Sequence, residues 1–116
     1  MQAIVVASRN NYWEKKLAAE VETKIQAIGF GLATASEATA AVLISDGRPL
    51  LKTEQDKLKN FLKDKTVVKP HKLLVIYHIA DDPVPDDWAA VADFIAKDIY
   101  DVIGCLKDYW FFSHNT

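Results

Sequence analysis

The sequence contains a single cysteine, Cys105, so no disulfide can form within the chain and no cluster of thiolates can hold a metal. The three histidines, His71, His78 and His114, do not share the spacing of a metal site. No apolar run approaches the length of about 18 residues that a membrane span needs, and the first residues lack the basic start of a signal peptide. We therefore expect a soluble, cytoplasmic protein that binds neither a metal nor a cofactor.

Glycine is also scarce, with four residues in 116. Phosphate-binding loops need glycines because the backbone has to approach the anion closely, and the loop Ser8-Arg9-Asn10-Asn11 after the first apolar run has none. No Gly-x-Ser-x-Gly motif is present to expose a serine nucleophile. The chain also lacks the block of Lys and Arg that is typical of proteins that bind nucleic acid directly.

What is present is an alternation of apolar and amphipathic segments in a chain whose residues are 50% hydrophobic. Short continuous apolar runs predict strands covered on both faces, and amphipathic stretches that follow capping residues predict helices. The predicted strands are residues 3–7, 31–34, 41–45 and 73–79, and the predicted helices are residues 11–28, 53–62 and 86–109. This order predicts a single small three-layer α/β domain over residues 1–116, with a mostly parallel sheet of four to five strands flanked by about three helices.

Three local features can be predicted more closely. Asn11 and Glu14 have the spacing of a capping box, for a helix whose apolar side carries Trp13, Leu17, Val21, Ile25 and Ile28. Residues 31–34 and 41–45 are too close in sequence for a parallel crossover of about 10–12 residues, so they form an antiparallel hairpin or are not both strands. The apolar end of the chain, residues 109–112, is expected to pack back on the sheet, for example as a last edge strand.

Charge is distributed unevenly along the chain. Residues 1–80 carry 12 Lys or Arg against 8 Asp or Glu, a charge of +4, whereas residues 81–116 carry 2 Lys against 8 Asp, a charge of −6. On a helix of about 100° per residue, residues 86–109 place their carboxylates within an arc of about 140°, opposite an apolar face. Phe94 falls inside this arc, as an interface anchor within a polar rim does. The predicted partner-binding residues are Asp86, Asp87, Asp93, Phe94, Asp98, Asp101 and Asp108.

A row of carboxylates complements the Lys and Arg surface of a protein that binds nucleic acid. The leading hypothesis is a non-catalytic binding module, an immunity-type inhibitor of the bacterial kind that neutralises a basic partner such as a nuclease toxin. An ordinary solvated helix face is the competing interpretation of the same residues. A subunit that assembles through residues 109–112 is a further alternative, and the sequence does not indicate an oligomeric state.

An enzyme is the alternative of a different class. Ligands of α/β sheets bind beyond the carboxyl ends of the strands. The polar residues expected there are Ser8, Arg9, Asn10, Asp46, Arg48, His78 and Asp81. Asp46 ends a strand, as the phosphorylated aspartate of receiver domains does, but Ser8-Arg9 stands where those domains carry the acidic pair that holds magnesium.

A family resemblance bears on the same alternative. The apolar first strand with Ser8, Trp13, the helix ending at Gly29, the run at residues 42–45 and the acidic Glu54 together resemble Toll/interleukin-receptor-like domains. The resemblance implies an enzyme that cleaves nicotinamide dinucleotides with a glutamate, here Glu54. The strand-end residues Ser8, Arg9, Asp46 and His78 would then complete the site of this or another nucleotide-processing enzyme.

Overall fold

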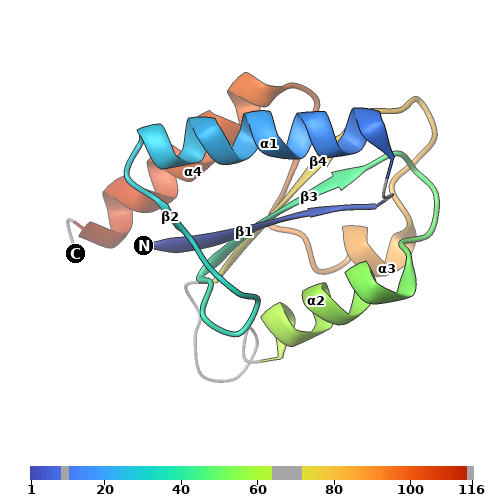
Figure 1. Ribbon diagram of the computed structural model, residues 1–116, viewed down its shortest axis with the longest axis horizontal. Helices are drawn as coiled ribbons and strands as arrows, with labels where there is room; N and C mark the ends of the chain where they lie inside the picture. Colours follow the sequence, from blue (N-terminus) through green and yellow to red (C-terminus); the bar gives the residue numbers. More distant parts are fainter. Residues whose placement is uncertain (9–10, 64–71, 115–116) are drawn as a thin grey trace.

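The computed structural model describes residues 1–8, 11–63 and 72–114, and it contains one sheet of five parallel strands in the order β2-β1-β3-β4-β5 (Figure 1). The strands are β1 (Gln2–Ala7), β2 (Gly31–Leu32), β3 (Ala40–Ser45), β4 (Leu73–His78) and β5 (Phe94–Ala96). The helices of the described part are α1 (Tyr12–Ala27), α2 (Lys52–Leu62), α3 (Asp86–Ala89) and α4 (Ile99–His114). The predicted three-layer α/β fold is confirmed, with a sheet that is entirely parallel in these residues.

The sheet is covered on both faces. Helices α1 and α4 lie on the upper face in Figure 1, and α2 and α3 lie on the lower face. Every residue of the central strand β3 is buried, with Val42 and Ile44 packed on the α1/α4 side and Leu43 on the α2 side. A strand without a solvent face has no polar positions, which explains why β3 is a continuous apolar run in the sequence. None of the helices in the described residues is long and apolar enough to cross a membrane.

Helix α1 begins at the predicted capping box, but its buried face differs from the prediction. The Asn11 side chain accepts a hydrogen bond from the Glu14 backbone N–H at 2.8 Å. Trp13, predicted to be on the apolar side, is 69% exposed, whereas Glu14 is 2% exposed. Residues spaced by four drift about 40° per step around a helix, so Trp13 lies about 120° from Ile25. Glu14 is close to three full turns from Ile25 and shares its buried direction.

The prediction for residues 31–45 is wrong. Both β2 and β3 are strands, and both are parallel to β1, on its two sides. β2 ends at Leu32, level with Ala3 of β1, and β3 begins at Ala40, level with the same residue. The connection of residues 33–39 therefore does not return along the length of a strand, which is why it is shorter than an ordinary parallel crossover.

The predicted helix over residues 86–109 is also wrong, because this segment forms α3, β5 and α4. Asp93 lies where the chain passes from α3 to strand β5. Its backbone N–H donates to the Leu74 carbonyl at 2.9 Å, and its carboxylate accepts from the Leu74 N–H at 2.8 Å. These bonds start the pairing of β5 with β4. Asp86, expected as the N-cap, is the first residue of α3 behind Pro85, and the acidic arc on one helix does not exist.

The last apolar residues belong to α4 and not to an edge strand. Their packing against the body of the domain is confirmed for Tyr109 and Trp110, which lie against the core on the α1/α4 side. The Tyr109 hydroxyl donates to the Thr39 carbonyl at 3.3 Å. Gly29, with φ 108°, lies under the Trp110 ring, where an added Cβ would be 3.2 Å from the indole nitrogen. Both the backbone conformation and the close approach therefore favour glycine at this helix end.

Candidate functional site

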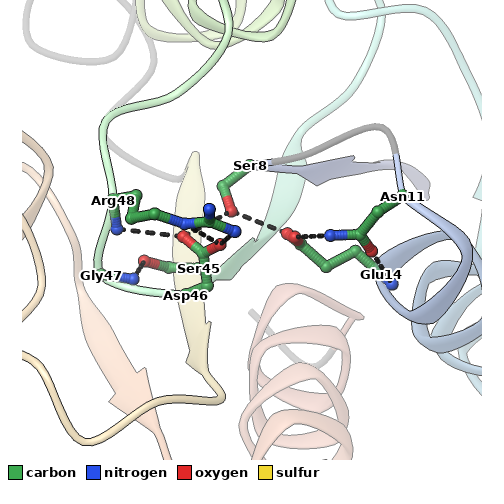
Figure 2. A network of polar contacts seen from close by, with 7 residues as sticks. All are labelled: Ser8, Asn11, Glu14, Ser45, Asp46, Gly47 and Arg48. Atoms are coloured by element: carbon green, nitrogen blue, oxygen red, sulfur yellow. Dashed lines mark hydrogen bonds and ion pairs between the residues drawn. The ribbon is translucent and has the colours of Figure 1, made fainter.

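A polar cluster lies at the carboxyl ends of β1 and β3 (Figure 2). The chain continues from β1 to β2 on one side and returns to β3 on the other, so this is the switch point at which parallel α/β sheets bind ligands. Ser8 follows β1 and Asp46 follows β3. The Ser8 hydroxyl lies 2.7 Å from a Glu14 carboxylate oxygen and 3.3 Å from an Asp46 carboxylate oxygen. Arg48 bonds to Asp46, so the fold brings together three of the predicted strand-end residues.

Glu14 is the buried carboxylate of this cluster. The Ser8 hydroxyl has one proton for two carboxylate acceptors, and the Glu14 oxygen is the nearer of them. The Asn11 side-chain amide donates to the second carboxylate oxygen at 3.0 Å. Hydrogen bonds to an ionised group offset part of the cost of removing it from water. These contacts join Ser8, at the end of β1, to helix α1. Because Ser8 is buried, its hydroxyl is not exposed as a nucleophile would be.

Asp46 is paired with Arg48 in the turn after β3. The Arg48 side chain donates from Nε and Nη2 to one carboxylate oxygen at 2.8 and 2.5 Å, and its backbone N–H donates to the other at 3.0 Å. Burial alone would raise the pKa of Asp46. The hydrogen bonds and charge of Arg48, together with the Ser8 hydroxyl, outweigh burial and hold this pKa below its usual value. Arg48 is thus engaged within the turn.

The remaining predicted strand-end residues lie apart from Ser8, Asp46 and Arg48 or outside the described residues. His78 ends β4, level with Ser45, and its Nε2 contacts the Asp82 carbonyl oxygen. Its buried Nδ1 has no hydrogen-bond partner in the described part of the chain. Glu54 lies in the first turn of α2 and pairs with Lys57 at 3.2 Å. Arg9, Asn10 and His71 lie outside the described residues.

The structure distributes the predicted partner-binding residues over three elements. Asp86 and Asp87 are in α3, Asp93 and Phe94 are at β5, and Asp98, Asp101 and Asp108 are at or in α4. Asp93 holds Leu74, as described above, and the Asp98 carboxylate accepts from the Asp101 N–H at 2.8 Å, as a helix cap does. Phe94 is 43% exposed on the edge strand.

Most of the exposed aspartates in the last third of the chain, like Glu20, Glu22 and Glu37, have no ion pair with Lys or Arg among the described residues, but the aspartates lie closer together in the sequence. The ion pairs that join Lys or Arg to acids among the described residues are Arg48–Asp46, Lys52–Asp56 and Lys57–Glu54. Seven exposed aspartates of the last third of the chain have no such partner within 4.0 Å in the same residues. They are Asp81, Asp82, Asp86, Asp87, Asp98, Asp101 and Asp108. We call Asp81, Asp82, Asp86 and Asp87 the acidic segment. Of these four residues, only Asp86 and Asp87 are among the predicted partner-binding residues.

A groove borders the acidic segment between α2 and α3. It has a volume of about 450 Å³. Pro85, Trp88 and Val91 line one side, and Leu50 and Leu62 are on the other, with Asp87 among the lining residues. Lys59 and Gln55 of α2 also line it, so the groove combines apolar walls with one carboxylate and one ammonium group.

One exposed aromatic pair was missed by the sequence analysis, which assigned Trp13 to the core. The rings of Tyr12 and Trp13 meet edge to face at 5.7 Å, and both side chains are exposed on the first turn of α1. The sequence does contain a signal for this exposure. Glu14 is close to three helical turns from Ile25 and shares its buried direction, so the preceding residue, Trp13, points toward solvent.

Neither a family model, nor a curated protein, nor a solved structure matches the chain. The described residues contain two candidate sites, the polar cluster at the ends of β1 and β3 and the acidic segment with its groove.

Proposed function

We propose that this protein is a non-catalytic binding module that engages a basic protein through the acidic segment, in the manner of an immunity-type inhibitor of a nuclease toxin. One observation carries the proposal. Four exposed carboxylates occur within residues 81–87, and none lies within 4.0 Å of a Lys or Arg among the residues that the structure describes. The proposal keeps Asp86 and Asp87 of the predicted partner-binding residues and adds Asp81 and Asp82.

Electrostatics favours a cationic partner for this segment. Like charges that are close in sequence repel one another, and a cationic surface relieves this repulsion when it docks. Carboxylates without internal ion pairs lose no contact within the chain when they bind an Arg or Lys of another protein. The surface of a nuclease that contacts phosphates is rich in these residues, so carboxylates can occupy it in place of nucleic acid.

The groove between α2 and α3 supplies the apolar part of such an interface. Binding energy in protein complexes concentrates in buried aromatic and aliphatic contacts, while the surrounding charges steer the encounter. Trp88 is half-buried and Val91 is exposed beside Asp87. An apolar side chain of the partner would enter the groove while its basic residues meet the acidic segment.

The contacts of the strand-end residues do not favour the alternative of a dinucleotide-cleaving enzyme. Ser8 is buried and donates to a carboxylate, and Glu54 is engaged by Lys57. These contacts stabilise local structure, as the ion pairs and caps of other folds do.

The test compares two double variants with the same change of charge. Asp86→Asn/Asp87→Asn neutralises part of the acidic segment, and Glu20→Gln/Glu37→Gln neutralises two exposed acids elsewhere as the control. Wild type and both variants are used in parallel as bait to capture a basic protein. The association rate of the captured protein with each variant is then measured at low and moderate salt. We expect the first variant to slow association on the order of tenfold at low salt, with a shallower salt dependence. Equal rates and equal salt dependence in both variants would show that the segment is only solvated.

A further inference from the structure

The outward face of α4 carries a glycine that nothing in the described part of the chain requires. Gly104 is exposed, and an added Cβ would meet no atom within 4 Å. Its φ is not positive, so the backbone conformation is open to any residue. Glycine within a helix lowers helix stability relative to alanine. The backbone at this position is therefore open to a close approach by another helix.

Gly104 is the centre of an exposed face with a regular pattern. Tyr100 is 81% exposed and Phe111 is 57% exposed, one turn before and two turns after it. The exposed face consists of Tyr100, Asp101, Gly104, Lys107, Asp108 and Phe111. Val102 and Leu106 on the opposite face are fully buried in the core. Large aromatic side chains on a helix face next to a residue without a side chain are typical of a helix-packing surface.

The pattern is complementary to itself. When two copies of a helix pack antiparallel with Gly104 of each at the crossing, residues equally far before and after it face each other. Asp101 of one copy then meets Lys107 of the second copy, and the two-fold axis repeats this ion pair. Tyr100 meets Asp108 of the second copy, where its hydroxyl can donate to the carboxylate. The absence of a side chain at Gly104 lets the two backbones approach closely.

A groove extends the same surface toward α1. It has a volume of about 350 Å³, and its apolar lining comes from Ala27 at the end of α1, from Ile28 that caps this helix and from Ile103 of α4. Lys24, Tyr100 and Lys107 complete the lining around Gly104. The second copy can therefore bury apolar area on two helices. Tyr109 and Trp110, by contrast, pack against the core of their own chain and are not part of this surface.

We propose that this protein forms a two-fold symmetric dimer in which the exposed faces of α4 pack antiparallel across Gly104. The contact is isologous, so the association closes at two copies. It does not use the acidic segment, which lies in α3 and in the connection before it and not in α4.

The first experiment is a charge exchange, read by sedimentation over a range of protein concentrations. Asp101→Lys and Lys107→Asp each place like charges opposite each other twice, and we expect each to raise the dimer dissociation constant by at least about tenfold. The double variant Asp101→Lys/Lys107→Asp restores opposite charges and returns the constant toward the wild-type value. Glu37→Lys makes the same change of charge as Asp101→Lys at an exposed residue between β2 and β3, and it should leave the dissociation constant unchanged.

The second experiment uses Gly104→Leu. The space around this position is open within the chain and leucine is the better helix former, so the variant should keep the wild-type circular dichroism and melt at or above the wild-type temperature. In the dimer the added side chain separates the two helices, and we expect at least about a tenfold loss of affinity. A wild-type protein that stays monomeric at every concentration overturns the proposal. So does a dimer that tolerates Gly104→Leu, or one that the charge exchange fails to restore.

Discussion

Two groups of carboxylates in this molecule have opposite environments. At the ends of β1 and β3, Glu14 and Asp46 receive hydrogen bonds from Ser8, Asn11 and Arg48. In the acidic segment, the carboxylates are exposed and have no Lys or Arg neighbour within 4.0 Å in the described residues. The carboxylates of the first group stabilise the fold through these internal hydrogen bonds, and the bonded oxygens are therefore already engaged within the chain. The second group contributes little to folding, and its charge is available to another molecule.

The largest expected effect separates the two groups by stability. Glu14→Ala removes the acceptor of Ser8 and Asn11 in a buried place, and we expect the free energy of unfolding to fall by about 2–3 kcal/mol. Asp86→Ala in the acidic segment should change it by less than about 0.5 kcal/mol. Urea denaturation of both variants measures the difference. Similar losses in both would mean that the acidic segment also supports the fold, and the comparison would fail.

A smaller effect depends on pH. The pKa of Asp46 is lower in the folded protein than in the unfolded chain, so the ionised carboxylate stabilises the fold above the unfolded value of about 3.9. This stabilisation is lost as the pH falls through the folded pKa. Asp46→Asn should therefore lower stability at neutral pH by about 1 kcal/mol, and the difference from wild type should disappear in acid. A difference that does not change with pH would show that the Arg48 contact does not act through the charge.

The smallest effect probes the field of the exposed carboxylates. Burial raises the pKa of the Cys105 thiol, and the charges of Asp108 and Asp93 raise it further. Asp108→Asn should lower this pKa and increase the alkylation rate of the thiol near pH 8, by about twofold. Asp86→Asn is the control, because Asp86 is more distant from Cys105 in the sequence than Asp108 is. It should leave the alkylation rate unchanged. If both variants react at the wild-type rate, water screens the Asp108 charge before it reaches the thiol.

The buried elements were the predictable part of the fold. β1, β3 and β4 are continuous apolar runs because helices cover both of their faces, and Asn11 caps α1 through a local contact that the sequence contains. Burial and local hydrogen bonds leave a direct signal in the residue pattern. This signal was sufficient for the class of fold and for the placement of Ser8 and Asp46 at the same edge of the sheet.

The elements between residues 86 and 109 were not predictable, because a distant contact decides them. Alanine-rich residues 89–92 favour a helix locally, and the apolar spacing fits a period of 3.6. The helix ends because Asp93 bonds to Leu74, nineteen positions earlier in the sequence. A strand as short as β5 has too few residues to show its own alternation. The sequence therefore predicted the acidic character of the candidate interface but not the elements on which its residues lie.

The two outer strands of the sheet have a consequence for solubility at high concentration. β2 has 2 residues and β5 has 3. A long open edge offers a row of unpaired backbone groups on which another chain can add as a strand, the step that begins fibrous aggregation. Each outer strand offers only a few such groups, and Asp93 and Lys97 flank the apolar residues of β5 as charged gatekeepers. The β5 side of the sheet is thus protected against indefinite growth.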